Sequence, residues 1–181
     1  MIQLHDKTFV PFINAAQIDE AVVKVACQVE NDFRDETPVF VAVLNGAFMF
    51  ASDFMKHYKS NCEISFVKLA SYEGTSSTND VKQLIGLNQD LKGRSVVLIE
   101  DIVDTGLSLT FLKHRMEEAS PKSIRFATCL YKPDVAKHDF AIDWIGFNID
   151  ERYFVGYGLD LKQIFRGLPG IYAVKKNNGE S

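Results

Sequence analysis

Two buried-strand patterns, each followed by a helix pattern, constrain the fold of this sequence more than any other feature. Val39–Leu44 reads VFVAVL and Ser95–Glu100 reads SVVLIE. Nearly all of these side chains are apolar, which is typical of central strands that are covered on both faces of a parallel sheet. Because a helix pattern follows each run, the sequence predicts an α/β fold in which right-handed crossovers join parallel strands.

The remaining elements fit this prediction. From Asn14 to Phe33, apolar residues recur at helical spacing, and Asn14 with Gln17 resembles a capping box. Further helices are expected at Ala47–Lys59 and Leu107–Ala119, and further strands at Glu63–Ser71 and Ser123–Tyr131. Ligands of such sheets bind beyond the carboxyl ends of the strands, so the residues at those ends are the candidates for a site.

Composition excludes several classes of protein. The 181 residues contain no repeat, low-complexity tract or linker rich in proline and glycine, so we expect a single domain spanning 1–181. A net charge of -4 disfavours a nucleic-acid partner, which usually requires a basic face. The apolar runs are far shorter than the ~20 residues that cross a bilayer, and the N-terminal residues lack a signal-peptide pattern. We therefore expect a cytoplasmic protein without a nucleic-acid or membrane partner.

The segment that follows the second buried strand has the composition of an anion-binding loop. Backbone N–H groups of Asp104, Thr105, Gly106, Leu107 and Ser108 would converge at a helix start, where the positive end of the helix dipole favours an anion. Gly106 lets the backbone approach a ligand closely. The hydroxyls of Thr105 and Ser108 add donors for phosphate oxygens.

Glu100 and Asp101 precede this loop and add a second kind of chemistry. Their ionised side chains only accept hydrogen bonds, which suits paired sugar hydroxyls or hydrated Mg²⁺. A ribose 5-phosphate is therefore one ligand for the whole segment. The alternative is structural, with ordinary polar residues at a strand end and Asp104 or Thr105 capping the helix. Capping does not account for the acidic pair, but these residues alone leave both interpretations open.

IEDIVDTGLSL resembles the phosphoribosyl pyrophosphate (PRPP) motif of type I phosphoribosyltransferases, and the two acids followed by DTG resemble its hypoxanthine-guanine branch. The similarity continues, in the family's order, through VFVAVLNGAFMF, LASYEG, YKPD, ERYFVGYGLD and FRGLPG. It implies a central parallel sheet flanked by helices, a hood from the N-terminal segment and the C-terminal part, and a flexible lid loop at about 71–84. It also implies Mg²⁺-dependent transfer of the phosphoribosyl group from PRPP to hypoxanthine or guanine, with release of pyrophosphate, in purine salvage.

The resemblance assigns roles to particular residues, each matched by its motif. PRPP would be bound by Glu100, Asp101, Asp104, Thr105, Gly106, Leu107 and Ser108. Pyrophosphate would be bound by Asn45, Gly46, Ser71, Tyr72 and Arg166. The purine would be bound by Lys132, Tyr153, Phe154 and Asp160, and Mg²⁺ by Glu100, Asp101 and Asp160. Asp104 would be the general base that takes the N7 proton of the purine.

The pyrophosphate loop and the lid also have ordinary interpretations. Asn45-Gly46 suits a plain strand-to-helix turn. In the family, the peptide bond at this point is cis and a basic residue often stands where this chain has Asn45, which leaves a side-chain contact from Asn45 open. The polar lid stretch also reads as a simple hairpin connection. In the family it closes over the site and excludes water.

The residues assigned to the purine, and Arg166, also have ordinary interpretations. A lysine at a strand end is usually solvated, although the three donors of Lys132 would favour a 6-oxo group over the 6-amino group of adenine. By periodicity, Tyr153 and Phe154 read as core. A surface salt bridge would account for either Asp160 or Arg166 alone.

Two other functions share the motif. A phosphoribosyltransferase for xanthine or another base would keep the PRPP loop. Some proteins of this fold are PRPP-sensing regulators, but those that bind nucleic acid need a basic surface that this acidic chain lacks. The resemblance also implies a homodimer or homotetramer, and the four histidines have no assignable role.

Overall fold

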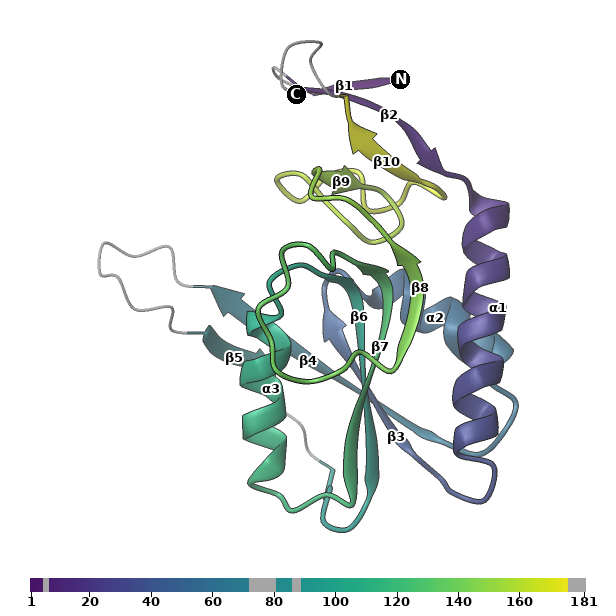
Figure 1. Ribbon diagram of the computed structural model, residues 1–181, viewed down its shortest axis with the longest axis vertical. Helices are drawn as coiled ribbons and strands as arrows, with labels where there is room; N and C mark the ends of the chain where they lie inside the picture. The colour runs from purple at the N-terminus through teal and green to yellow at the C-terminus, as the bar shows by residue number, and fades with distance from the viewer. Residues whose placement is uncertain (5–6, 72–80, 86–88, 176–181) are drawn as a thin grey trace.

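The computed structural model describes residues 1–4, 7–71, 81–85 and 89–175. Within these ranges the strands form a larger sheet, ordered β5-β4-β3-β6-β7-β8, and a smaller one, ordered β1-β2-β10-β9. The larger sheet and its helices form the body of the molecule, and the smaller sheet lies at the end toward which β8 points (Figure 1). We call the smaller sheet the hood.

The predicted parallel sheet is confirmed. Its parallel strands are β4 (Glu63–Ser71), β3 (Val39–Leu44), β6 (Ser95–Val103), β7 (Ser123–Tyr131) and β8 (Trp144–Asn148). The edge strand β5 (Val81–Ile85) pairs antiparallel with β4. In β3, the residues from Val39 to Ala42 have no exposed surface, as expected for an apolar strand covered on both faces.

Helices cover both faces of this sheet. The helices α1 (Ala15–Asp32) and α2 (Phe48–His57) lie on one face, and α3 (Leu107–Glu117) lies on the other (Figure 1). The predicted capping box of α1 is present, because the side chain of Asn14 accepts from the Gln17 backbone N–H at 3.0 Å and the Gln17 side chain accepts from Asn14 at 3.0 Å. In the described part of the chain, no helix is long and apolar enough to cross a membrane.

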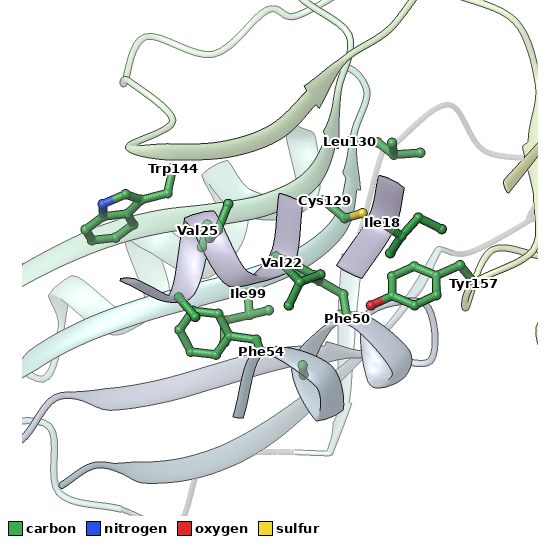
Figure 2. Packing of buried hydrophobic residues seen from close by; sticks show 14 of the residues in the cluster. Ile18, Val22, Val25, Phe50, Phe54, Ile99, Cys129, Leu130, Trp144 and Tyr157 are labelled. Carbon is green, nitrogen blue, oxygen red and sulfur yellow. The ribbon is translucent and has the colours of Figure 1, made fainter. Parts of the chain in front are cut away.

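The main core fills the space between the sheet and the pair α1 and α2. Val22 and Val25 of α1 meet Phe54 of α2, Ile99 of β6 and Trp144 of β8 (Figure 2). Burial of each such side chain contributes about 1.5–3 kcal/mol relative to its exposure to water. The opposite face has its own cluster under α3, formed by Leu98, Leu109, Leu112 and Met116 among others.

The hood joins segments from distant parts of the sequence. Its strands are β1 (Ile2–Leu4), β2 (Lys7–Ile13), β9 (Phe154–Val155) and β10 (Ile171–Val174). β10 pairs antiparallel with both β2 and β9, so it is the link between the two segments. The Val174 N–H also donates to the Tyr153 carbonyl at 2.9 Å, which extends the pairing beyond β9.

Two expectations about boundaries change. β6 does not end at Glu100 but continues to Val103, because Ile102 pairs with Leu130 and Val103 with Tyr131 of β7. Asp101, which was expected after the strand, therefore lies within it, and Glu100 is no longer its last residue. α2 and α3 are also shorter than expected, and α3 ends at Glu117 shortly before Ser120 turns the chain with a φ of 53°.

The predicted lid at 71–84 lies mostly outside the described residues. Ser71 ends β4, and 81–84 belong to β5. Tyr72 lies outside the described residues, so its assignment to pyrophosphate stays a prediction.

Candidate active site

Glu100 begins the polar end of β6. Its side chain lines a small pocket, and its Oε2 is buried without a hydrogen-bond partner. Burial raises the pKa of Glu100 well above its ordinary value, and the nearby Asp101 raises it further. A buried acceptor without a partner costs about 1–3 kcal/mol, so this oxygen is suited to a ligand that supplies a donor or a cation.

Asp101 lies on the opposite face of β6 from Glu100, because successive strand residues alternate. Its carboxylate rests on Gly46, where a Cβ atom would lie 2.0 Å from Asp101 Oδ2. Burial raises the pKa of Asp101 to about 6, although backbone N–H groups and the charge of Arg166 act against that rise. The adjoining Leu44–Asn45 peptide bond is cis, as the resemblance implied.

The predicted phosphate loop forms the start of α3. Gly106 is the N-cap and has a φ of 83°, a left-handed conformation that suits glycine. Within the described part of the chain, residues 102–109 and Glu100 line one pocket of about 90 Å³. The backbone N–H groups at this end of α3 favour an anion there. Glu100 and the loop residues 104–108 therefore meet in one place.

Lys132 connects the end of β7 to this loop. Its Nζ donates to Asp104 Oδ2 at 2.9 Å, and its side chain is only 9% exposed. The expectation that a lysine here is solvated is therefore wrong for this residue. Asp104 itself remains open to solvent, with 55% of its side chain exposed. The pair thus places one ammonium beside one carboxylate, and Asp104 lines the pocket.

The segment 153–166, which we call the wall segment, borders the site, because Gly158 packs against Gly46 and Arg166 lies near Asp101. Tyr153 is 43% exposed, and its hydroxyl donates to the Asp160 carbonyl at 2.7 Å. Phe154 is buried, with its ring 5.2 Å from that of Phe12 in the hood. Tyr153 is therefore not core, whereas Phe154 is. Arg166 binds Asp160 Oδ1 at 2.6 Å and the Gly158 carbonyl at 2.6 Å, so the two charged residues form an ion pair.

The residues present fit a hard divalent cation. Burial raises the pKa of both Glu100 and Asp101, and a nearby positive charge would lower both pKa values again by favouring the ionised carboxylates. Among the residues that the structure describes, no group of three or more His, Cys, Asp or Glu is placed to hold a metal. Mg²⁺ does not require such a group, because it often takes one or two carboxylates and fills its shell with substrate phosphates and water.

The sequence and structure match known phosphoribosyltransferases. The phosphoribosyl transferase domain family matches residues 14–162. Hypoxanthine-guanine phosphoribosyltransferase of Bacillus subtilis is 34% identical over 164 residues, which cover 90% of this chain and 91% of that protein. The chain belongs to the hypoxanthine-guanine phosphoribosyltransferase family.

Other members of the family extend this match. Hypoxanthine-guanine-xanthine phosphoribosyltransferase of Tritrichomonas foetus is 33% identical over 91% of this chain and 90% of its own. A crystal structure of a Bacillus anthracis hypoxanthine-guanine phosphoribosyltransferase superposes with a TM-score of 0.85 at 38% identity, covering 92% of this chain and 97% of that one. The predicted fold and family are therefore confirmed.

Not every residue assigned by the family motif joins the pocket in the same way. Asn45 is exposed beside Gly46, and no side-chain hydrogen bond of Asn45 is seen among the described residues. Arg166 and Asp160 are bound to each other, so contact with pyrophosphate or a cation would share or replace that ion pair. Ser71 lies at the end of β4, next to the undescribed part of the lid.

Gly158 lies beside this site, although no residue pattern in the sequence pointed to it. It has a φ of 97°, and a Cβ there would lie 2.1 Å from the Gly46 carbonyl oxygen. The wall segment therefore lies directly against the pyrophosphate loop, which lies against Asp101. The GYG sequence at 156–158 is a visible sign of special backbone geometry, because glycine readily adopts a positive φ.

Proposed function

We propose that this protein transfers the 5-phosphoribosyl group of PRPP to hypoxanthine, guanine or both, with Mg²⁺ bound, and releases pyrophosphate. The observation that carries the choice of base is the 2.9 Å contact between Lys132 Nζ and Asp104 Oδ2. O6 and N7 are neighbours on one edge of a 6-oxopurine. An ammonium beside a carboxylate is complementary to that edge, because O6 accepts a hydrogen bond and N7–H donates one.

When the base binds, Lys132 and Asp104 would contact different atoms of it. Lys132 would turn a donor from Asp104 to O6, where the 6-amino group of adenine offers no acceptor. Asp104 would then accept the N7 proton as N9 bonds to C1 of the ribose. Proton transfer of this kind contributes typically 10²- to 10⁴-fold to a rate.

The phosphoribosyl group would be held by the start of α3 together with the carboxyl groups of β6. The backbone N–H groups of 104–108 would bind its 5-phosphate, and Glu100 and Asp101 would accept from its hydroxyls. A bound Mg²⁺ would neutralise charge on the leaving pyrophosphate. The contribution of the chain is to hold base and sugar in line, which is worth more than the proton transfer alone.

Nucleotide formation with each base separately tests the proposal. The protein is incubated with PRPP, Mg²⁺ and one of hypoxanthine, guanine, xanthine or adenine, and the monophosphate is separated by chromatography. We expect product with hypoxanthine or guanine and none above background with adenine. Product with adenine alone, or no product with any base, would contradict the proposal.

Asp104→Asn tests the proton acceptor. The amide keeps the shape of the carboxylate but cannot take the N7 proton, so we expect single-turnover rates to fall about 10²- to 10⁴-fold. The affinity for PRPP should change less than about threefold, because the loop amides remain. Asp134→Asn, an exposed carboxylate two residues after Lys132, is the matched control. A full single-turnover rate in the Asp104 variant would refute the base assignment.

Xanthine is a second candidate substrate. The Tritrichomonas foetus relative includes xanthine in its name and is 33% identical to this chain. Xanthine keeps the O6 and N7 edge that Lys132 and Asp104 complement. The same assay decides the question, since a xanthine product comparable with that from hypoxanthine would add it to the substrates.

We further propose a cytoplasmic homodimer or homotetramer, the assemblies that the family resemblance implied. Among the structures similar to this chain is a hypoxanthine phosphoribosyl transferase of Trypanosoma cruzi studied for its oligomeric state, at 25% identity. Sedimentation velocity would test this part. A single species with the 20.4 kDa mass of one chain at micromolar concentration would contradict it.

A further inference from the structure

The connection between β7 and β8 runs along the phosphate loop. We call residues 132–143 the β7–β8 connection. Its first residue, Lys132, donates its N–H to the Val103 carbonyl at 3.0 Å, and Lys137 donates its N–H to the Thr105 carbonyl at 3.0 Å. The connection is therefore fixed to the loop at two points, one on each side of Asp104.

His138 follows the second of these points and packs against Gly106. A Cβ on Gly106 would lie 2.5 Å from Cδ2 of His138 and 3.1 Å from its Cβ. The imidazole edge therefore occupies the space beside the N-cap of α3 that a side chain at position 106 would need. Glycine can adopt many backbone conformations, including the φ of 83° at Gly106. The His138 imidazole beside it restricts the conformations that are open to Gly106.

The imidazole is itself held in place by a stack of rings. It lies 4.5 Å from the Phe140 ring at 26°, and Phe140 lies 4.4 Å from Phe126 of β7 at 24°. Its Nδ1 is 2.6 Å from the Phe140 carbonyl oxygen, which can only accept, so Nδ1 carries a hydrogen. Its Nε2 is 3.5 Å from the Tyr131 hydroxyl. The ring is thus anchored to β7, a rigid strand of the sheet.

We propose that His138 is a positioning residue for the phosphate-binding loop of the proposed transferase. Its ring is anchored to β7 and packs against Gly106. It thereby keeps the N–H groups at the start of α3 in the arrangement that binds the 5-phosphate. A binding group whose supporting shell holds it in place loses less conformational freedom when the ligand arrives. His138 need not touch the substrate to act in this way. The inference rests on the proposed function only for the identity of the phosphorylated ligand.

Ribose 5-phosphate is the probe, because its binding needs no turnover. We expect His138→Ala to raise its Kd about tenfold by isothermal titration calorimetry. In the complete reaction, the KM for PRPP should rise by a similar factor, with kcat within about twofold and the KM for the base unchanged. His138→Phe keeps the ring stack, so it should restore the Kd to within about threefold of the wild type. His114→Ala, on an α3 side chain that is 71% exposed, is the control.

Several results would overturn the inference. One is a wild-type Kd for ribose 5-phosphate in His138→Ala, and another is an equal rise in the KM for the base. If His138→Ala does not fold, the comparison of His138→Phe with His138→Asn decides. Asn retains a donor for the Phe140 carbonyl but no ring, so equal affinity of these two variants would refute the role of the stack. A wild type that binds ribose 5-phosphate but makes no nucleotide would contradict the proposed function alone.

Discussion

The two halves of β6 differ in burial and contain opposite kinds of side chain. From Val96 to Ile99 the strand is apolar and has no exposed surface. The second half, from Glu100 to Val103, begins with two carboxyl groups: Glu100 is half-buried with a buried Oε2, and Asp101 is 9% exposed. The first half stabilises the fold through burial of apolar surface. In the second half, burial of Glu100 Oε2 without a partner costs free energy until a ligand or a cation satisfies it. Within one strand, apolar residues that stabilise the fold are therefore followed directly by carboxyl groups that are suited to a ligand.

The largest expected effect is in the apolar half. Leu98→Ala removes a side chain with no exposed surface from the cluster under α3, and we expect the free energy of unfolding to fall by about 2–5 kcal/mol. Urea denaturation measures this loss. The kcat of the folded fraction should be unchanged. Phe66→Ala, at a β4 residue that is 40% exposed, is a control that should cost less than about 1 kcal/mol. A similar loss in both variants would contradict the contrast.

The next substitution should raise the free energy of unfolding rather than lower it. The pKa of Asp101 rises from 3.8 to about 6 on folding, so the folded state holds the proton longer. The free energy of unfolding should therefore fall as the pH rises from about 4 to about 6 and stay lower above that range. Asp101→Asn removes this loss, so we expect up to about 3 kcal/mol of added stability at pH 7.5 and little difference near pH 3.5.

Urea denaturation of Asp101→Asn at both pH values measures this gain, with Asp134→Asn as the exposed control. The variant should bind PRPP poorly despite its greater stability. Lower stability than the wild type at pH 7.5 would show that the burial of Asp101 carries no cost.

The smallest effect concerns the neighbour of that carboxylate. In Gly46→Ala the new Cβ would lie 2.0 Å from Asp101 Oδ2, so the carboxylate must move. We expect kcat/KM for PRPP to fall about a hundredfold, or about 2.7 kcal/mol. Gly167→Ala is the matched control, because a Cβ there meets nothing within 4 Å. Equal activity of the two alanine variants would remove Gly46 from the site.

The local patterns predicted β3, β4, β6 and β7 of the larger sheet and its three helices, but not the outer strands β5 and β8. β3, β4 and β7 have the predicted bounds, and the capping box of α1 is present. β6 was predicted too short, because the polarity of Glu100 suggested a strand end. The strand continues to Val103 because it pairs with β7 up to that residue. Pairing between separate strands leaves little local signal in the sequence.

The candidate site also has one part that local sequence patterns predict and another part that they do not. The loop at 104–108 could be read from its residue types and from the helix that follows. The contact of Lys132 with Asp104 joins residues from different strand ends, and the contact of His138 with Gly106 depends on the path of a connection without regular structure. No spacing in the sequence predicts either contact, since both depend on the tertiary fold.

The pairing of β10 has a consequence for the order of synthesis. β2 emerges from the ribosome early, yet its main partner, β10, is made after every strand of the larger sheet. β10 also supports β9 and the Tyr153 backbone. We therefore expect a nascent chain to complete the loop at 104–108 before the wall segment at 153–166. The half of the site that would bind sugar phosphate would then exist, during translation, without the half that would hold the base.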